Sequence, residues 1–229
     1  MNSSRRLFIA SSAILPAACM GLPYEKGIPV FTPPTIPAIR PPKVGQEWTY
    51  TKKNVFNGET VDVITERVAS VGSQIVIQRT GRNAEKYDDE IQGPWGTVIQ
   101  DPHWGNVVRY NPPIPLWPEV LKGNWSKEVI TKYIHPAYPD YSFPWQLYMT
   151  SVGWEKITVP AGKFVCMRFH NLIEYQDADD NILGEIRHEI IWFSPSIGRW
   201  VAREVSGSHL VSDQPFPDDS FQWQLTSYK

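Results

Sequence analysis

The chain has 229 residues, of which 41% are hydrophobic and 20% are charged, and its formal net charge is −2. The length fits one folded domain, and the composition argues against a disordered or membrane-spanning chain. The small net charge argues against a nucleic-acid partner, because such partners are met by a basic patch or stripe.

The composition is also rich in rings and prolines, with 10 Trp, 10 Tyr, 9 Phe and 21 Pro. Aromatic side chains favour half-buried pleated surfaces, whereas proline breaks helices. The composition therefore predicts an all-β protein with few or no helices.

Residues 1–19 are predicted to be an export signal. Arg5 and Arg6 precede a short apolar stretch at 7–15, which is too short to cross a bilayer because a spanning helix needs about 20 residues. The sequence at 4–9 resembles the twin-arginine export signal. The alternative is an ordinary secretion signal that contains two arginines, and both alternatives predict an exported protein.

Residues 15–19 resemble the box at which bacterial lipoproteins are cleaved and lipidated. Ala17 and Ala18 suit the small positions before Cys19, whereas Pro16 departs from the preferred leucine. The resemblance implies lipidation at Cys19 and a membrane as partner, in the periplasm or at the outer membrane. Acyl chains contribute about 0.8 kcal/mol per buried CH₂, so two or more anchor a protein firmly. The alternative is cleavage after Cys19.

Residues 20–43 contain many prolines, which favour an extended polyproline conformation and pair poorly in sheets. The segment is predicted to be a stalk between the anchor and the domain. The alternative is an arm that lies on the surface of the domain.

Residues 44–229 are predicted to form one β domain. Alternation around the Asn57-Gly58 turn indicates a three-stranded meander at 46–79. The interval 80–150 is less regular, with short strands expected near 97–100 and 106–110. The β pattern returns after Gly153. Strands separated by turns are expected at 154–159, 164–175, 184–193, 199–205 and 219–227. Successive hairpins predict a curved antiparallel sheet of about eight to eleven strands, folded as a half-barrel or a sandwich.

Four stretches of this domain resemble a known family. They are Gly45-x-x-Trp48-x-Tyr50, the segment from Pro115 to Ser126, the segment from Thr158 to Phe164, and the segment from Trp192 to Val201. These stretches resemble uncharacterised exported proteins of Gram-negative bacteria that are often described as lipoproteins. The resemblance covers about 44–205 and implies an all-β fold, loosely like the half-barrels of periplasmic lipoprotein carriers. It implies no reaction and no site residues.

The sequence contains no motif that predicts catalysis, a cofactor or a metal site. His188-Glu189 begins like a zinc-protease motif, but Trp192 occupies the place of the second histidine and the segment alternates like a strand. We therefore expect a non-enzymatic protein without cofactor. The alternative is a hydrolase with a dispersed site, with candidate residues Asp101, His103, His135 and Asp140.

The tryptophans of the irregular interval are the candidate ligand-binding residues, namely Trp95, Trp104, Trp117, Trp125 and Trp145. Exposed, contiguous rings would form a binding surface, whereas buried rings would only fix loops onto the sheet. We expect an envelope protein that binds either an envelope partner or an apolar ligand. An apolar ligand would bind in a concave sheet that is lined by Phe169, Ile173, Ile190 and Trp192. The alternative is a carbohydrate-binding or carbohydrate-active domain that uses the loop tryptophans.

Overall fold

The computed structural model describes residues 27–104, 107–176, 178, 185–211, 214–217 and 220–229. Cys19, Arg5 and Arg6 lie outside the described residues. The described residues form strands and no helix, which confirms the predicted all-β class. None of them forms a helix that could span a bilayer.

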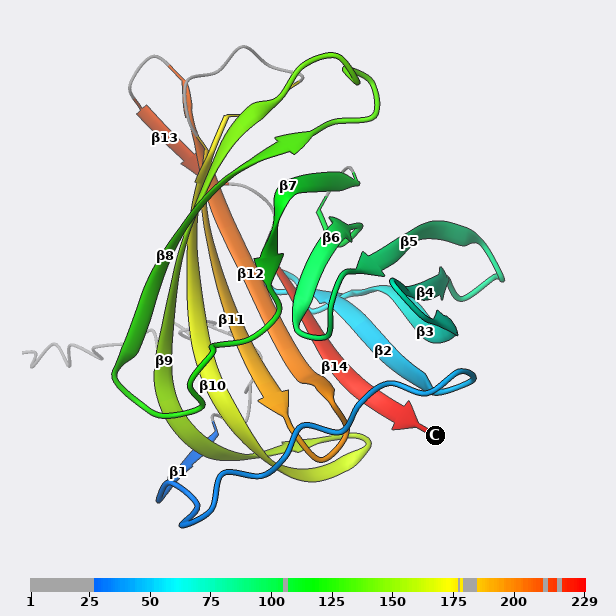
Figure 1. Ribbon diagram of the computed structural model, residues 1–229, viewed down its shortest axis with the longest axis vertical. Coiled ribbons are helices and arrows are strands. Elements are labelled where there is room, and N and C mark those ends of the chain that lie inside the picture. Colours follow the sequence, from blue (N-terminus) through cyan, green and yellow to red (C-terminus); the bar gives the residue numbers. More distant parts are fainter. Residues whose placement is uncertain (1–26, 105–106, 177, 179–184, 212–213, 218–219) are drawn as a thin grey trace, which may run out of the picture.

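The strands are numbered along the chain in Figure 1. They are β1 (Ile28–Val30), β2 (Glu47–Asn54), β3 (Thr60–Val71), β4 (Ile75–Thr80), β5 (Lys86–Gln92), β6 (Thr97–Asp101), β7 (Val108–Pro115), β8 (Trp125–Ile134), β9 (Phe143–Val159), β10 (Gly162–Tyr175), β11 (Glu185–Ser194), β12 (Arg199–Val211), β13 (Gln214–Pro217) and β14 (Phe221–Tyr228).

The strands pair in the order β9-β10-β11-β12-β14-β2-β3-β4-β5-β6-β7-β8, and β8 pairs again with β9. The described sheet is therefore a closed barrel of twelve strands, to which β1 and β13 are added at strands β9 and β12. The prediction of a half-barrel or sandwich with about eight to eleven strands was wrong. The ladder between β8 and β9 runs from the pair Trp125–Ser151 to the pair Tyr133–Phe143. Along this ladder neither strand is a free edge.

The error arose in the interval 80–150, which provides β5 to β8 and the first part of β9. Proline lacks the N–H that a ladder requires. In β7 the pairs with β8 end at Asn111 and those with β6 resume at Ile114, so Pro112 and Pro113 lie where the ladder is interrupted. The prolines are therefore compatible with a strand that pairs only at its two ends.

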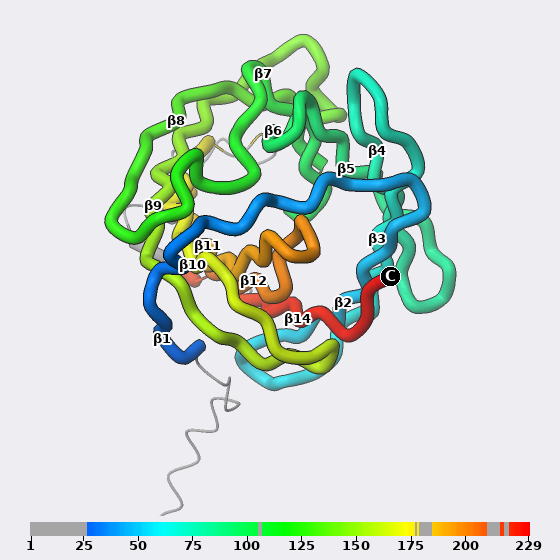
Figure 2. The backbone as a smooth tube through the Cα atoms, turned by 60° about the horizontal axis from the view of Figure 1, so that its bottom comes forward, coloured from blue at the N-terminus to red at the C-terminus, as the bar shows by residue number. Residues whose placement is uncertain are grey.

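The meander expected at 46–79 is confirmed by β2, β3 and β4, and the C-terminal hairpins by β9 to β12. Residues 27–43 run across the lower end of the barrel, as the blue segment in Figure 2 shows. The Arg40 amide donates to the Pro195 carbonyl at 2.9 Å, and Ile36 and Ile39 pack against the core.

Side chains that point inward fill the lower part of the barrel with an apolar core. Trp48, Tyr50, Phe169 and Leu225 are each at most 2% exposed. The Tyr50 ring stacks on Trp200 at 3.8 Å between centroids, and its hydroxyl donates to the Trp200 carbonyl at 2.9 Å. This core supports a layer of buried charges and, at the other end of the barrel, an open cavity.

Candidate functional site

A cavity with a volume of about 840 Å³ lies at one end of the barrel, where β2 ends and β3 and β14 begin. This end of the barrel is uppermost in Figure 1. We call this cavity the cup. It is lined by Lys52, Val61, Asp62, Ile64, Arg79, Tyr87, Asp88, Pro102, His103, Trp104, Val107, His135, Pro136, Ala137, Arg187, Val205, Gly207, Phe221 and Trp223. The volume is within the range of small-molecule sites, roughly 300–1,000 Å³.

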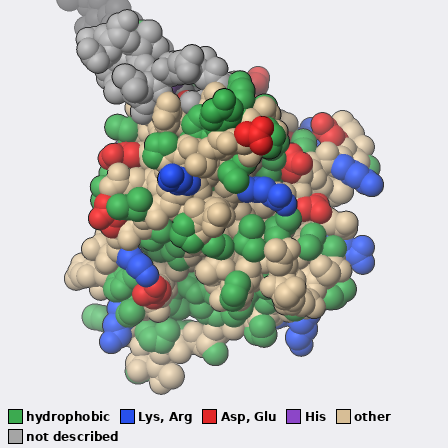
Figure 3. Space-filling view, turned by 45° about the horizontal axis from the view of Figure 1, so that its top comes forward, with side chains coloured by type: hydrophobic (Ala, Val, Ile, Leu, Met, Phe, Trp, Pro, Cys, Tyr) green, Lys and Arg blue, Asp and Glu red, His purple; other side chains and the backbone are tan. Residues whose placement is uncertain are grey.

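The lining of the cup mixes rings, aliphatic groups and charges of both signs. The face of the molecule drawn in Figure 3 likewise shows hydrophobic side chains among separate positive and negative groups. None of Phe169, Ile173, Ile190 and Trp192 is among the lining residues. The cup is therefore not the apolar hollow that the sequence led us to expect.

The connection from β6 to β7 forms the base of the cup. Asp101 ends β6 and accepts hydrogen bonds from the His103 amide at 2.9 Å and from the Trp104 indole N–H at 3.0 Å. A carboxylate that bonds to the backbone two residues later is typical of a tight turn. The turn directs His103 and Trp104 inward, and the Trp104 ring packs edge-on against Trp145 at 5.4 Å.

A set of buried charges, which we call the ionic cluster, begins at this base and continues below it: Glu66, Arg79, Glu90, Asp101, His103 and Arg199. The Arg199 guanidinium joins two strands of the opposite wall. Its Nη2 donates to Glu66 Oε2 at 2.7 Å and its Nη1 donates to Glu90 Oε1 at 2.8 Å. Nη2 also donates to Glu90 Oε2, so Arg199 binds both oxygens of Glu90, and bidentate pairing of this kind is among the stronger charged hydrogen bonds.

The charges of the cluster set the pKa values of its acids. Burial alone would raise the pKa of Glu66 and Glu90, but the Arg199 charge and the contacts with other partners, including His103, together outweigh it and lower both pKa values. Burial would also raise the pKa of Asp101, and there the charge and hydrogen bond of His103 lower it below its usual range. All three carboxylates are therefore ionised near neutral pH.

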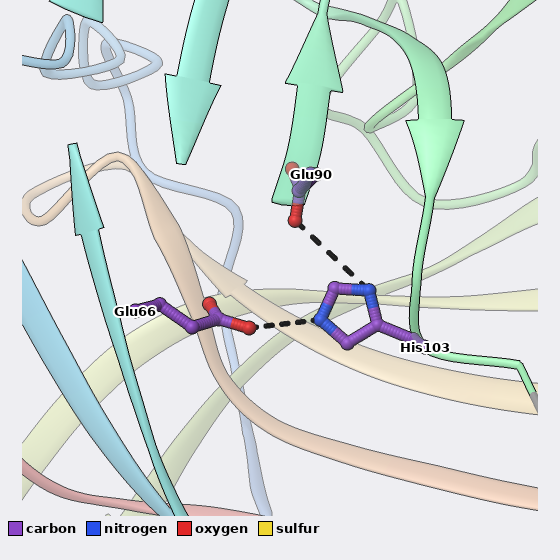
Figure 4. Close-up of side chains that lie close together, drawn as sticks. All are labelled: Glu66, Glu90 and His103. Carbon is purple, nitrogen blue, oxygen red and sulfur yellow. Dashed lines mark hydrogen bonds and ion pairs between the residues drawn. The ribbon is translucent and has the colours of Figure 1, made fainter. Parts of the chain in front are cut away.

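His103 bridges two of these carboxylates. Its Nδ1 lies 2.7 Å from Asp101 Oδ1, and its Nε2 lies 2.9 Å from Glu66 Oε1. Figure 4 shows the contact with Glu66. Both ring nitrogens are therefore within hydrogen-bond distance of a carboxylate oxygen. Two arginines, Arg79 and Arg199, lie among the same carboxylates.

Glu66, Glu90 and His103 also bring their possible ligand atoms within 4.8 Å of one another, close enough to surround a cation. However, Arg199 binds both carboxylates, and Arg79 Nε lies 3.4 Å from Glu66 Oε1. A metal ion would have to displace these guanidinium groups. The donor set is that of a paired ionic cluster and does not fit a metal centre.

The candidate tryptophans do not gather on one surface. Trp104 lines the cup and contacts Trp145, which is 1% exposed in the core. Trp95 and Trp117 form a second pair at 4.7 Å, and Trp117 stacks on Phe193. Trp125 begins β8 and packs partly buried against the core. Only Trp104 of the five contributes to the cup.

Of the four residues considered for a hydrolase, the structure brings three to the cup or its base. Asp101 contacts His103, and His135 lines the same cavity, whereas Asp140 is exposed in the connection from β8 to β9. Both nitrogens of His103 are occupied by carboxylates, so this ring has no free atom to act as a general base. The zinc-protease resemblance at His188 lies in strand β11, as expected from its alternation.

Sequence reasoning did not find Glu66, Glu90, Arg199 or the neighbouring pair of Glu189 and Arg203, whose Nε donates to Glu189. One signal was present. Glu66 alternates in phase with Ile64 and Val68, which places a charge on the buried face of a strand. A buried charge requires a partner, but the partner of Glu66 lies 133 residues away along the chain.

Comparisons with known proteins identify the fold. No protein-family model and no curated protein matches the chain. Among solved structures, a putative lipoprotein from Parabacteroides distasonis ATCC 8503 matches with a TM-score of 0.53 and 14% identity, over 84% of this chain and 99% of that one. A putative exported protein with YmcC-like fold from Bacteroides fragilis NCTC 9343 matches with a TM-score of 0.53 and 11% identity, over the same shares.

The chain has the YmcC-like fold. The resemblance to exported lipoproteins, which was drawn from the sequence, is thereby confirmed at the level of the fold. At these identities the YmcC-like fold transfers no residue roles. The function must therefore be argued from the cup and the ionic cluster.

Proposed function

We propose that the protein is an exported, non-enzymatic protein of the bacterial cell envelope that binds a small ligand in the cup. The observation that supports the ligand is the cup itself, a cavity of about 840 Å³ at one end of a closed barrel. The core fills the barrel below the cup, and residues 27–43 cross the lower end (Figure 2), so the barrel is not an open channel from end to end.

The ionic cluster supports a binding role over a catalytic one. Its charges are paired with one another, and His103, the ring that lies at the base of the cup, uses both nitrogens in this pairing. Such a network fixes the base of the cup in one conformation, which reduces the ordering cost of binding. The cup residue Trp104 is fixed in the same way through its bond to Asp101.

The location is proposed from two observations. Residues 1–19 have the features of an export signal, with Arg5 and Arg6 before the apolar stretch and Cys19 at its end. The fold neighbours are described as a putative lipoprotein and a putative exported protein. We propose anchoring through a lipid on Cys19. Mass spectrometry of the mature N-terminal peptide tests this, since a free Met20 terminus would contradict it.

The ligand proposal is tested by calorimetric titration of the mature protein with three naphthalene probes that differ only in charge: 2-naphthoate, 2-naphthalenemethanol and 2-naphthylmethylammonium. Ala137→Trp places a large ring at an exposed position that lines the cup, whereas Lys163→Trp places the same ring at an exposed position near the start of β10. At least one probe is expected to bind the parent and Lys163→Trp but not Ala137→Trp. If no probe binds the parent, the proposal is wrong.

The carbohydrate alternative has one observation in its favour, because Trp104 presents a ring beside charged groups in the cup. The same titration with a panel of envelope glycans tests it. Displacement of a bound naphthalene probe by a glycan would favour a sugar ligand, and absence of displacement across the panel would exclude it.

A further inference from the structure

The buried polar atoms of the cup that lack a hydrogen-bond partner are donors. Among the described residues that line the cup, three buried nitrogens have no hydrogen-bond partner: Arg187 Nε, His135 Nε2 and Trp223 Nε1. The Nδ1 of His135 accepts from the Ala137 amide at 3.2 Å, so in the neutral ring Nε2 bears the hydrogen. All three nitrogens are therefore donors, and none of the unpartnered buried acceptors belongs to a described cup residue.

The acids around the cup are already supplied with donors. Asp62 accepts from the Tyr87 hydroxyl at 2.7 Å, the Val63 amide at 2.7 Å and the Arg82 amide at 3.2 Å. The hydrogen bond to Asp62 raises the pKa of Tyr87 to about 12, so the phenol stays protonated and remains a donor. Glu185 accepts from both the Tyr175 hydroxyl and Arg187 Nη2. Asp88, the remaining acid of the lining, is exposed.

Arg187 is positioned by rings as well as by Glu185. The Arg187 guanidinium lies 5.3 Å from the Trp104 ring and 5.3 Å from the Tyr175 ring. Lys52 Nζ lies 3.9 Å from the Phe221 ring. A ring face orients a guanidinium without using its N–H groups. Arg187 is also 21% exposed in its side chain, so a ligand in the cup can reach it.

We propose that the ligand bound in the cup is an organic oxyanion, a carboxylate or phosphate attached to a ring or an apolar chain. Arg187 binds the oxyanion through the edge of the guanidinium that Glu185 does not occupy, and Trp223 and His135 supply further N–H donors. The apolar part of the ligand packs on Trp104, Phe221 and Val205. The inference rests on the proposed function, since it names the class of ligand for the same cavity.

The ionic cluster does not oppose such a ligand. Its three carboxylates are paired within the cluster with Arg79, Arg199 and His103, and of the cluster only Arg79 and His103 line the cup. The carboxylate charges are therefore offset by the groups that bind them. An oxyanion in the cup therefore meets mainly the local donors of the wall.

The three naphthalene probes test the inference because they share a ring and differ in the group attached to it. In the parent, 2-naphthoate is expected to bind about tenfold more tightly than 2-naphthalenemethanol, since charged hydrogen bonds are the stronger ones, and 2-naphthylmethylammonium is expected to bind most weakly. Arg187→Gln should reduce the affinity for naphthoate to that for the alcohol and leave the alcohol unchanged. Arg67→Gln, at an exposed arginine on β3, is the control and should change neither.

A second variant covers the case in which Arg187→Gln does not fold. Trp223→Phe keeps a ring but removes the indole donor, and it should weaken naphthoate binding several-fold more than alcohol binding. The inference is overturned if the alcohol or the ammonium probe binds the parent as tightly as naphthoate, or if the folded variants keep the full preference for naphthoate. Failure of all three probes to bind the parent would instead refute the proposed function itself.

Discussion

Removing the Arg199 guanidinium tests the structural role of the ionic cluster. In Arg199→Leu, Glu66 and Glu90 lose their shared partner, and their side chains are 1% and 3% exposed. Glu66 keeps His103 and Glu90 keeps the Gln92 amide at 2.7 Å, so neither carboxylate is left without a donor. Leaving buried charges short of a partner costs about 3–5 kcal/mol, and we expect a loss of unfolding free energy in this range.

The assay is urea unfolding at pH 7, followed by tryptophan fluorescence. Arg67→Leu is the matched control, because its ion pair with Glu47 is at 3.5 Å and its side chain is 59% exposed; exposed pairs contribute about 0–1 kcal/mol. Adding Glu66→Gln and Glu90→Gln to Arg199→Leu should recover part of the loss, since the buried charges are then removed. A loss for Arg199→Leu no larger than that of the control would refute the reasoning.

Three further predictions concern pH, a backbone contact and a buried hydroxyl. Folding lowers the pKa values of the three cluster carboxylates. The free energy that these ionised groups contribute to the folded state is therefore complete above their unfolded pKa values of about 4, and it is lost as the pH falls below those values. A free energy of unfolding in urea that is unchanged down to pH 3 would contradict this. Gly198→Ala would place a Cβ 2.0 Å from the Arg40 carbonyl, whereas Gly45→Ala, also at positive φ, meets no atom within 4 Å. Both should lose about 1–2 kcal/mol from backbone strain, and only Gly198→Ala should make the N-terminal segment sensitive to trypsin, so equal digestion of the two would count against the contact. Tyr50→Phe removes the buried hydrogen bond to the Trp200 carbonyl and should cost about 0.5–1.5 kcal/mol in the same unfolding assay, and no change would show that the bond is not formed.

The parts of the fold that the sequence predicted are those in which neighbours in sequence are neighbours in the sheet. The meander at 46–79 and the hairpins from β9 to β12 pair successive segments, and their period-two alternation and turns are local signals. Closure of the barrel also needs β14 to pair with β2, which is far away in the sequence, and β8 to pair with β9 over nine residue pairs, across the proline-containing connection at 135–142. Alternation in β8 is weak, because half of its side chains are exposed and only Thr131 and Tyr133 are buried.

The site was predicted in part for a related reason. Trp104, His103 and Asp101 were named from residue type, and a short turn brings them together at the base of the cup. Arg199 and Glu90 are separated by 109 residues and meet only because β12 and β5 face each other across the barrel. No local pattern specifies which of several inward charges become partners, since that depends on strand order and register.

Indole ¹⁵N spectra of the mature protein, recorded with and without 2-naphthoate, test most directly whether the cup is the binding site. The N–H signals of Trp104 and Trp223, which line the cup, are expected to shift, and those of Trp95 and Trp117 are expected to stay in place. Shifts at Trp95 and Trp117 with no change at Trp104 and Trp223 would place the ligand elsewhere and contradict the assignment of the cup.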